Sequence, residues 1–314
     1  MTQPQLASAV MMIRPLHFGS NPETAATNAF QNVDDHDARA VAMAAIDEFD
    51  VAVVALEAAG IRTVVFEDRP EPFCTDATFP NNWMSTHPDG TVVTYPMHDP
   101  SRQREVRQDL IDALGASHGY RVERVIDLCG LREQGHFVEG TGSLVLDRPN
   151  RIAYACQSPR TTAEGVRAFC DRLGYDARRF HGVCGSGREI YHTNVMLSVG
   201  ERFALLCADA IPDTSERQHV ITSLLHSGRE LITFSLAQLD RFAGNALQVR
   251  GTDGAPRIVL STTAWTTFDE GQRQALQAHG TPVPIRIPTI ETYGGGSIRC
   301  MMCEVFLPRA NAPS

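Results

Sequence analysis

Five polar residues recur along the chain at nearly equal intervals, and this spacing constrains the fold more than any other feature of the sequence. They are Asn82, Glu139, His192, Asn245 and Cys300, separated by 57, 53, 53 and 55 residues (139−82, 192−139, 245−192, 300−245). A repeat of this kind indicates one supersecondary unit used several times. If the units ring a common axis, these side chains converge on one site. A Cys, a His and a Glu meeting there is the makeup of a nucleophilic enzyme.

Each unit has the same order of predicted elements: an apolar β-like run, a turn, a second run, an amphipathic helix and, in most units, a third run. The paired runs are residues 83–86 with 91–95, 143–146 with 152–156, 195–199 with 203–207, and 246–249 with 258–260. The helices are 101–114, 160–173, 214–225 and 266–278, and the third runs are 122–128, 231–234 and 283–287. Units of this kind predict an α/β protein.

The fifth unit is predicted to be split between the two ends of the chain. Residues 300–306 supply its central strands, while 9–13, a long helix at 35–59 and a strand at 63–66 supply the rest. Joining the ends in this way closes the ring and leaves no free sheet edge. No low-complexity linker interrupts the sequence, so we expect a single catalytic domain over residues 1–314.

Composition and charge argue against several classes of protein. The net charge of −9 disfavours a general nucleic-acid or anionic-membrane partner. No apolar stretch reaches membrane-spanning length, and residues 1–10 lack the features of a secretory signal. The eight cysteines are typical of free thiols in a reducing compartment, so we expect a cytoplasmic protein. Cys300 and Cys303 have CxxC spacing, but no second pair completes a zinc set, and we expect no metal and no cofactor.

Four segments carry a resemblance to a known superfamily. They are TDATFPNNW at 75–83, EGTGS at 139–143, HTNVML at 192–197 and GGGSIRCM at 294–301, and residues 14–25 fit as well. In this order and spacing they resemble the guanidino-group-modifying enzymes, or penteins, which include arginine deiminases, dimethylarginine dimethylaminohydrolases and amidinotransferases. More narrowly, they resemble the citrulline-utilisation hydrolase branch. The resemblance spans nearly the whole chain and implies a five-bladed α/β propeller.

The resemblance also implies a catalytic set. A guanidinium or ureido carbon is a poor electrophile, so its cleavage needs a strong nucleophile, a proton donor for the leaving nitrogen and later a water. By resemblance, Cys300 attacks this carbon, His192 protonates the leaving nitrogen and then deprotonates the water, and Glu139 orients the imidazole. Structural alternatives remain, because Cys300 could be a small buried residue and Glu139 could satisfy backbone donors around Gly140. Cys303, the rival thiol, is expected on the opposite strand face in a packing role.

The positions that match the acidic, substrate-gripping residues of arginine-processing relatives are mostly amides in this chain. Asn82 and Asn194 match acids, and Asn81 is neutral where a dimethylaminohydrolase has an acid. Asp76 alone remains acidic. A guanidinium presents only donors and suits carboxylates, whereas a ureido group also presents a carbonyl, so the amides favour a neutral ligand such as citrulline. The asparagines could instead cap turns. A neutral ligand also gives less electrostatic help in ionising the Cys300 thiol than a cation would, so Arg299 or the backbone would have to supply it.

Two arginines match the carboxylate-binding residues of the dimethylaminohydrolases. Arg102 and Arg160 come at equivalent points of neighbouring repeats, just after a hairpin and before a helix. The forked donors of arginine suit a substrate carboxylate, although arginines at such places can also be solvated surface charges. Residues 18–30 are polar and could cover the pocket as a lid. Asn245 lies in register with the site and could serve it or cap a turn.

The sequence thus predicts a metal-independent C–N hydrolase that acts on the ureido or guanidino group of a small arginine-derived amino acid. Hydrolysis of citrulline to ornithine, ammonia and carbon dioxide is the first choice. Arginine deimination or dihydrolysis is the second, and amidino transfer is the third. The remaining alternatives are a catalytically silent arginine or citrulline sensor and a zinc or redox module built on Cys300 and Cys303. A monomer and a homo-oligomer are equally compatible with the sequence.

Overall fold

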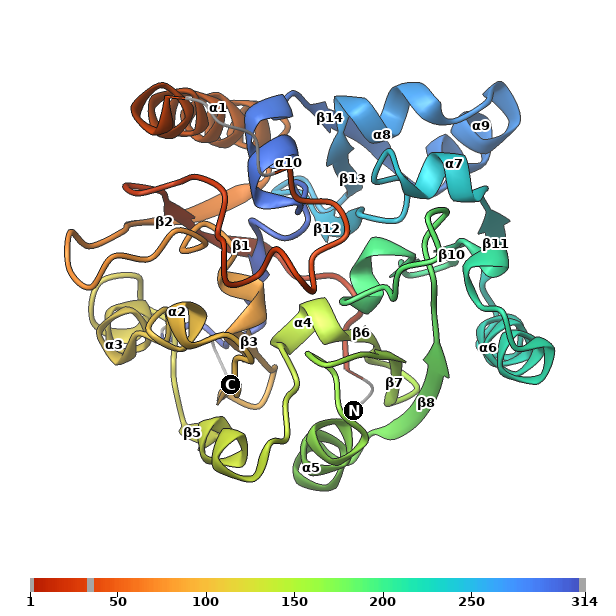
Figure 1. Cartoon of the computed structure of the whole chain (residues 1–314), viewed down its shortest axis with the longest axis horizontal. Helices are drawn as coiled ribbons and strands as arrows, with labels where there is room; N and C mark the ends of the chain where they lie inside the picture. The colour runs from red at the N-terminus through yellow and green to blue at the C-terminus, as the bar shows by residue number, and fades with distance from the viewer. Residues whose placement is uncertain (1–2, 33–36, 311–314) are drawn as a thin grey trace.

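The computed structural model describes residues 3–32 and 37–310, which form five three-stranded sheets around a common centre (Figure 1). In each sheet, or blade, the middle strand is antiparallel to one neighbour and parallel to the other. The blades are β15 (Cys303–Glu304), β1 (Ala9–Arg14) and β2 (Arg62–Glu67); β3 (Met84–Thr86), β4 (Thr91–Thr94) and β5 (Arg124–Asp127); β6 (Leu144–Asp147), β7 (Ile152–Gln157) and β8 (Asp176–His181); β9 (Leu197–Val199), β10 (Phe203–Leu206) and β11 (Glu230–Thr233); and β12 (Leu247–Arg250), β13 (Pro256–Ser261) and β14 (Thr281–Ile285). The ring of five units predicted from the repeat is confirmed.

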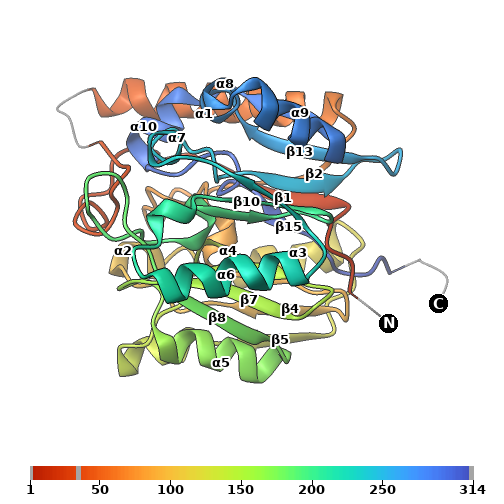
Figure 2. The same ribbon diagram turned by 90° about the vertical axis from the view of Figure 1, so that its right-hand side faces the viewer.

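The parallel strands of each blade are joined by a crossover that carries one or two α-helices, as parallel pairing requires. The crossover helices are α1 (Ala38–Ala58), α2 (Pro100–Gln103) with α3 (Gln108–Ala116), α5 (Ala163–Leu173), α6 (Thr214–His226), and α8 (Thr262–Thr267) with α9 (Glu270–His279). The longer ones lie on the outside of the ring (Figures 1 and 2). The helix expected at 35–59 is α1, and positions 35 and 36 lie outside the described residues. No helix within the described ranges is long and apolar enough to cross a membrane.

The blade shared by the two ends of the chain is confirmed, but its central strand is β1 and not residues 300–306, which were expected there. β15 pairs antiparallel with β1, placing Met11 opposite Cys303 and Val10 opposite Glu304. β1 then runs parallel to β2 on its other side, across the crossover helix α1. Helix α1 packs against the ring through an apolar face that includes the fully buried Phe49. The two ends of the chain therefore close the ring, but the predicted lack of a free sheet edge is wrong, because each blade is a separate three-stranded sheet and keeps edge strands such as the largely exposed β8.

Two predicted helices are each broken in two. The helix expected at 101–114 stops after α2, and α3 begins only beyond Arg107, whose backbone is extended and whose guanidinium binds Asp109 and the carbonyl of Glu67. The helix expected at 266–278 is α9, preceded by the separate helix α8. Asp269 and Gln272 form a capping box that starts α9. Apolar spacing continues across both breaks, so periodicity alone does not reveal them.

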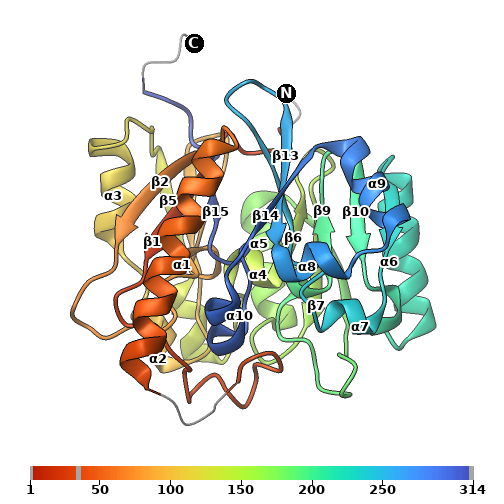
Figure 3. The same ribbon diagram turned by 90° about the horizontal axis from the view of Figure 1, so that it is seen from above.

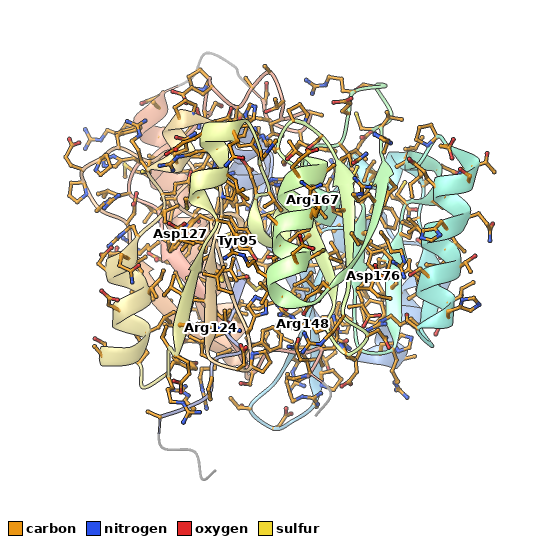
Figure 4. All side chains as sticks on the ribbon, turned by 90° about the horizontal axis from the view of Figure 1, so that it is seen from below. Tyr95, Arg124, Asp127, Arg148, Arg167 and Asp176 are labelled. Atoms are coloured by element: carbon orange, nitrogen blue, oxygen red, sulfur yellow. The ribbon has the colours of Figure 1, made fainter. Side chains whose placement is uncertain are left out.

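The sequence pattern misses strand β8 and three short helices, α4 (Gly140–Ser143), α7 (Leu236–Leu239) and α10 (Pro288–Gly294). β8 is an edge strand in which Phe180 is the single buried residue, so it lacks the apolar run that marks the other strands. Figure 4 views the molecule from this side, with Asp176 labelled at the start of β8 beside α5. Among the missed helices, α10 follows β14 and leads into the glycine run.

The strand expected at 300–306 starts later than predicted. Cys300 lies in a turn, where its N–H donates to the carbonyl of Ser297 at 2.9 Å, and β15 begins only at Cys303. Strand alternation therefore does not relate the two thiols. Cys303 nevertheless points away from Cys300 into the protein core, where its Sγ lies 3.4 Å from the carbonyl oxygen of Met84.

The five repeat residues all lie just before the first strand of a blade. Asn82 ends a short 3-10 turn, η1 (Pro80–Asn82), that leads to β3. Glu139 precedes the helical turn α4 (Gly140–Ser143), and His192 precedes η3 (Thr193–Val195). Asn245 and Cys300 stand before β12 and β15. Figure 1 shows α4 near the centre of the ring and residues 18–30, the covering segment, crossing in front of it; Figure 3 shows α10 at one end of the strands.

Candidate active site

A narrow cavity lies at the centre of the ring, where the starts of the blades meet the covering segment. Three of the repeat residues, Asn82, His192 and Cys300, line it. The other two sit directly behind them, since Glu139 is bonded to His192 and Asn245 to Cys300. The remaining lining residues are Thr24, Asn28, Asp76, Phe79, Arg102, Arg160, Tyr191, Gly294 and Gly296. The structure thus brings together the residues that the repeat predicts to converge.

Glu139 and His192 form a buried hydrogen-bonded pair. Glu139 Oε2 lies 2.8 Å from His192 Nε2, and Glu139 Oε1 accepts the backbone N–H of His98 at 2.9 Å. The exposed fractions of Glu139 and His192 are 0% and 2%. An ionised carboxylate can only accept, so Nε2 carries the imidazole proton and Nδ1 is left as a proton acceptor.

Burial and neighbouring charges set the protonation of this pair. Burial alone would raise the pKa of Glu139, but Arg160, the hydrogen bond from His192 and Arg102 hold that pKa far below its ordinary value. Burial lowers the pKa of His192 to about 4, against the opposing effect of Glu139. At neutral pH the pair is therefore a carboxylate beside a neutral imidazole, which is the form that can take up a proton.

Arg102 reaches the cavity with its guanidinium already bound by protein groups. Its Nε and Nη2 donate to the carboxylate of Glu105 at 2.8 and 2.9 Å, and its Nη1 donates to Asn82 Oδ1 at 3.0 Å. Asp76 lies 3.7 Å and Glu139 3.8 Å from the same guanidinium. Burial raises the pKa of Glu105 to about 7, against the attraction of Arg102. Arg102 is thereby held in one orientation and in turn fixes the side chain of Asn82.

Arg160 is held by the covering segment. Its Nε and Nη2 donate to Thr27 Oγ1 at 2.9 and 2.6 Å, and Nη2 also donates to the carbonyl of Thr24 at 3.3 Å. Its guanidinium lies over the ring of Tyr191 and 3.4 Å from Asp99. The hydroxyl of Thr27 therefore occupies the fork that a carboxylate would use. Arg102 and Arg160 are 3% and 1% exposed, which excludes the interpretation that they are solvated surface charges.

The covering segment forms part of the cavity wall and is bonded to the residues around it. Asn21 Nδ2 donates to Asp76 Oδ2 at 2.7 Å, and Asn28 Nδ2 donates to the carbonyl of Gly294 at 3.1 Å. Gly295 has a φ of +61°, and a Cβ there would come within 2.5 Å of the Asn28 amide. The glycine run therefore allows the covering segment to approach closely.

The four predicted polar pocket residues occupy different positions. Asp76 and Asn82 line the cavity. Asn81 is fully buried outside the cavity wall, with its Nδ2 3.4 Å from Thr141 Oγ1. Asn194 lies behind Cys300, with its Nδ2 3.7 Å from Cys300 Sγ and its Oδ1 without a hydrogen-bond partner among the described residues. Asp76 and Asn82 are therefore placed to touch a ligand directly, and Asn81 is not.

Of the two thiols of the CxxC segment, Cys300 alone lines the cavity. Its Sγ lies 3.2 Å from Asn245 Nδ2. The guanidinium of Arg299 turns away, donating to Glu304 Oε2 and to the carbonyl of Met302, both at 3.0 Å. Burial raises the pKa of Cys303 to about 12, so this thiol stays protonated in the core.

The described residues offer no ligand set for a metal. In residues 3–32 and 37–310, no group of three or more His, Cys, Asp or Glu side chains is placed to hold an ion. The eight cysteines are free and buried. The zinc interpretation of Cys300 and Cys303 therefore lacks supporting ligands in this part of the chain.

Several residues that support the site escape the sequence analysis. Glu105 follows Arg102 by three positions in a predicted helix, and this i,i+3 spacing of opposite charges could have revealed their ion pair. Thr27, Asp99 and Tyr191 reach Arg160 from other parts of the chain. Such contacts depend on the packing of blades against the covering segment, and no local pattern encodes them.

The ring of five mixed sheets with Cys, His and Glu at its centre defines a pentein-type propeller, and solved structures share this fold. The substrate-bound N-terminal domain of ArgZ, a cyanobacterial arginine dihydrolase, matches with a TM-score of 0.72 at 15% identity, covering 96% of this chain and 98% of that one. Unliganded AgrE matches with a TM-score of 0.72 at 15% identity, covering 97% of this chain and 40% of that one. A dimethylarginine dimethylaminohydrolase carrying a 4-chloro-2-hydroxymethylpyridine adduct matches at 0.63 and 12% identity, covering 96% and 100%.

The sequence also matches a family model. The model described as N,N dimethylarginine dimethylhydrolase, eukaryotic, matches residues 14–307, so the chain belongs to this family, whose members hydrolyse non-peptide C–N bonds. A comparison with curated protein sequences gave no match. The superfamily and the five-bladed propeller are thereby confirmed, and the narrower assignment to the citrulline-utilisation branch stays a prediction.

Proposed function

We propose that the protein is a cysteine-dependent hydrolase that converts citrulline to ornithine, ammonia and carbon dioxide. The observation that carries this proposal is the orientation of Asn82 at the cavity. Arg102 Nη1 donates to Asn82 Oδ1 at 3.0 Å, and a guanidinium can only donate, so the amide oxygen must face Arg102. The Nδ2 group of Asn82 is left buried without a hydrogen-bond partner among the described residues.

An unpartnered N–H donor in a buried site calls for an acceptor on the ligand. The Asn82 amide and the Nδ1 atom of His192 lie together, since a Cβ added to Gly142 would come within 2.5 and 2.7 Å of them. A ureido carbonyl can accept from Asn82, whereas a guanidinium offers only further donors. The orientation of Asn82 therefore supports a ureido substrate.

The N–H groups of a ureido ligand also find acceptors. Asp76 lines the cavity and presents carboxylate oxygens there. For the amino-acid end, we propose Arg160 as the principal carboxylate ligand, because its hydrogen bonds go to the hydroxyl of Thr27 and to a backbone carbonyl of the covering segment. The carboxylates of Asp99 and Glu139 lie farther away, at 3.4 and 3.8 Å. Arg102, bound on two sides by Glu105, acts mainly by fixing Asn82.

In the proposed mechanism, His192 moves the protons. Its Nδ1 takes the proton of Cys300, and Sγ attacks the ureido carbon. His192 returns that proton to the departing nitrogen as the C–N bond breaks, which releases ammonia and leaves a thiocarbamate between Cys300 and ornithine. Water, deprotonated by His192, then cleaves the C–S bond and the proton returns to sulfur. The N-carboxyornithine that forms loses carbon dioxide, so citrulline and one water give ornithine, ammonia and carbon dioxide.

Arginine is the second candidate substrate, and the charges around the cavity favour it. In the described structure, the carboxyl groups of Asp76, Asp99, Glu105 and Glu139 surround the guanidinium groups of Arg102 and Arg160, and Asp99 also pairs with His98. Such an excess of carboxylates attracts a cationic ligand. The names of two matched structures, both of proteins acting on arginine or its dimethyl derivative, point in the same direction.

We further propose that the whole chain acts as one catalytic domain on a small molecule in the cytoplasm. The buried free thiols suit a reducing compartment. The net charge of −9 gives no electrostatic support for a nucleic-acid or anionic-membrane partner. Assembly into a homo-oligomer is compatible with this activity.

Parallel product analysis tests the proposed substrate. Purified protein is offered citrulline, arginine, N,N-dimethylarginine and agmatine, and the products are identified by mass spectrometry. We expect ornithine from citrulline and little turnover of the other three. Formation of citrulline from arginine or dimethylarginine, with citrulline itself left intact, would overturn the proposal.

An amide-to-acid exchange tests the role of Asn82 in the same assay. Asn82→Asp replaces the free donor with an acceptor, and we expect kcat/KM for citrulline to fall by about 10- to 100-fold. Asn81→Asp is the matched control, because Asn81 lies outside the cavity wall and its exchange should leave substrate preference unchanged. An unchanged kcat/KM for citrulline in Asn82→Asp would remove the observation on which the substrate choice rests.

A further inference from the structure

The side chain of Asn245 makes the shortest polar contact of the Cys300 sulfur. Its Nδ2 lies 3.2 Å from Sγ, and the Nδ2 of Asn194 lies 3.7 Å away. Asn245 is fully buried, Asn194 is 1% exposed and Cys300 is 4% exposed. Two amides therefore stand behind a thiol whose other side faces the cavity.

The orientation of the Asn245 amide is fixed by the backbone next to the nucleophile. The N–H of Arg299 donates to Asn245 Oδ1 at 3.1 Å. A backbone N–H can only donate, so the amide oxygen must lie on that side and the NH₂ group must face the sulfur. The same Nδ2 also donates to the carbonyl of Asn194 at 3.3 Å. Rotation of the amide would break all three contacts, and Asn245 therefore presents a donor to Sγ.

A buried thiolate needs such donors. Removal from water disfavours the charged form of a thiol, and N–H groups directed at the sulfur favour it. The neighbouring cation does not serve this purpose, because the guanidinium of Arg299 is bound to Glu304 and to the carbonyl of Met302. The hydrogen bonds to Sγ in the described structure come from the two amides alone.

We propose that Asn245 is a catalytic residue that stabilises the Cys300 thiolate through its Nδ2–H, with Asn194 as a weaker second donor. The inference rests on the proposed role of Cys300 as the nucleophile. The thiol proton goes to His192, and the negative charge on sulfur is stabilised by the amide, first before attack and again when water cleaves the C–S bond. A neutral ureido substrate brings no positive charge to the thiol, so this support must come from the protein.

The pH dependence of Cys300 alkylation tests the proposal without any substrate. The rate of modification by iodoacetamide is followed at the Cys300 peptide by mass spectrometry in wild-type protein, Asn245→Asp and Asn245→Ala. Both variants lose the donor, and the aspartate also places a negative charge beside the sulfur. We expect the pH midpoint of alkylation to rise by about one unit or more in Asn245→Asp and by less in Asn245→Ala. An unmoved midpoint in both folded variants overturns the proposal, even if their activity falls.

Two further variants separate a catalytic effect from damage to the fold. Gln248→Glu makes the same amide-to-acid change three residues further along the chain. The buried Gln248 side chain is bonded to the backbone of Glu201 and His279 and not to the thiol, so this change should leave the pH midpoint of alkylation unchanged. If the Asn245 variants do not fold, Asn194→Ala carries the test, with a smaller rise expected because its contact is longer. A shifted midpoint with retained turnover in Cys300→Ala would show that the amide acts on the thiol but that the proposed nucleophile is wrong.

Discussion

The two halves of the candidate site hold their reactive groups by different means. Glu139 and His192 lie among ionised side chains, with Arg102 and Arg160 within 4 Å of the Glu139 carboxylate. Cys300 is held instead by neutral amides, and the nearest arginine in sequence directs its charge elsewhere. Neighbouring charges thus keep Glu139 ionised and burial keeps His192 neutral, whereas hydrogen-bond donors support Cys300, the proposed nucleophile. The predictions below test this division, from the largest expected effect to the smallest.

Removal of the Cys300 thiol, which is held by the amides, should abolish hydrolysis of the substrate. We expect Cys300→Ala to lose about 10⁴-fold or more in kcat, because no other thiol lines the cavity. Steady-state assays of ornithine formation measure this. Activity within tenfold of the wild type would mean that another group attacks the substrate.

Neutralising Glu139 should impair the proton transfers proposed for His192 while leaving the Cys300 thiol in place. In Glu139→Gln the imidazole loses its anionic partner, and we expect kcat to fall by about 10²- to 10⁴-fold. Glu291→Gln is the matched control, since Glu291 is also a buried acid but binds Ser297 instead of His192. Equal losses of kcat in the two variants would assign the effect to burial of an amide rather than to the imidazole.

Loss of either cavity arginine should weaken substrate binding more than turnover. We expect Arg160→Gln to raise KM by about 10- to 100-fold with a smaller change in kcat, because a charge-assisted fork for the carboxylate is removed. Arg102→Gln should raise KM less, because the Nε and Nη2 donors of Arg102 are already bound to the carboxylate of Glu105. The buried Arg229, bound to Asp147, supplies the control Arg229→Gln. An unchanged KM in both cavity variants would defeat the carboxylate assignment.

Acid should destabilise the folded protein through the buried His192. The folded pKa of His192 is about 4, below the value of about 6.5 for an unfolded histidine. Between these values the unfolded chain binds more protons, so the free energy of unfolding falls as pH drops from 7 to 4.5. Relative to wild type, we expect His192→Asn to reduce this loss by about 2 kcal/mol in urea titrations. His226→Asn, a change at an exposed histidine, is the control. If wild type and both variants lose the same free energy of unfolding between pH 7 and 4.5, the lowered pKa of His192 is not the cause.

The second thiol should matter for stability and little for catalysis. Cys303 packs in the core with its Sγ against the carbonyl of Met84. We expect Cys303→Ala to lower the free energy of unfolding by about 1 kcal/mol and to change kcat by less than about threefold. A loss of activity near that of Cys300→Ala would break the distinction between the two thiols.

The site was more predictable from the sequence than the boundaries of its elements. Asn82, Glu139, His192 and Cys300 could be placed together because one register repeats in every blade, and a ring turns equal spacing into proximity. β8 could not be predicted, because an exposed edge strand carries no apolar pattern. The contact of Thr27 with Arg160 spans 133 residues and depends on how the covering segment crosses the ring. Local pattern therefore located the reactive residues, whereas their hydrogen-bond partners required the fold.

The most direct test of the account is the identity of the covalent intermediate. Wild-type protein is mixed with citrulline, quenched in acid within the first turnovers and analysed by intact-protein and peptide mass spectrometry. We predict a citrulline-derived thiocarbamate on the peptide that carries Cys300, absent from Cys300→Ala and resolved from Cys303 by fragmentation. Turnover of citrulline with an adduct on another residue, or with ornithine still formed by Cys300→Ala, would contradict the claim that Cys300 attacks the ureido carbon.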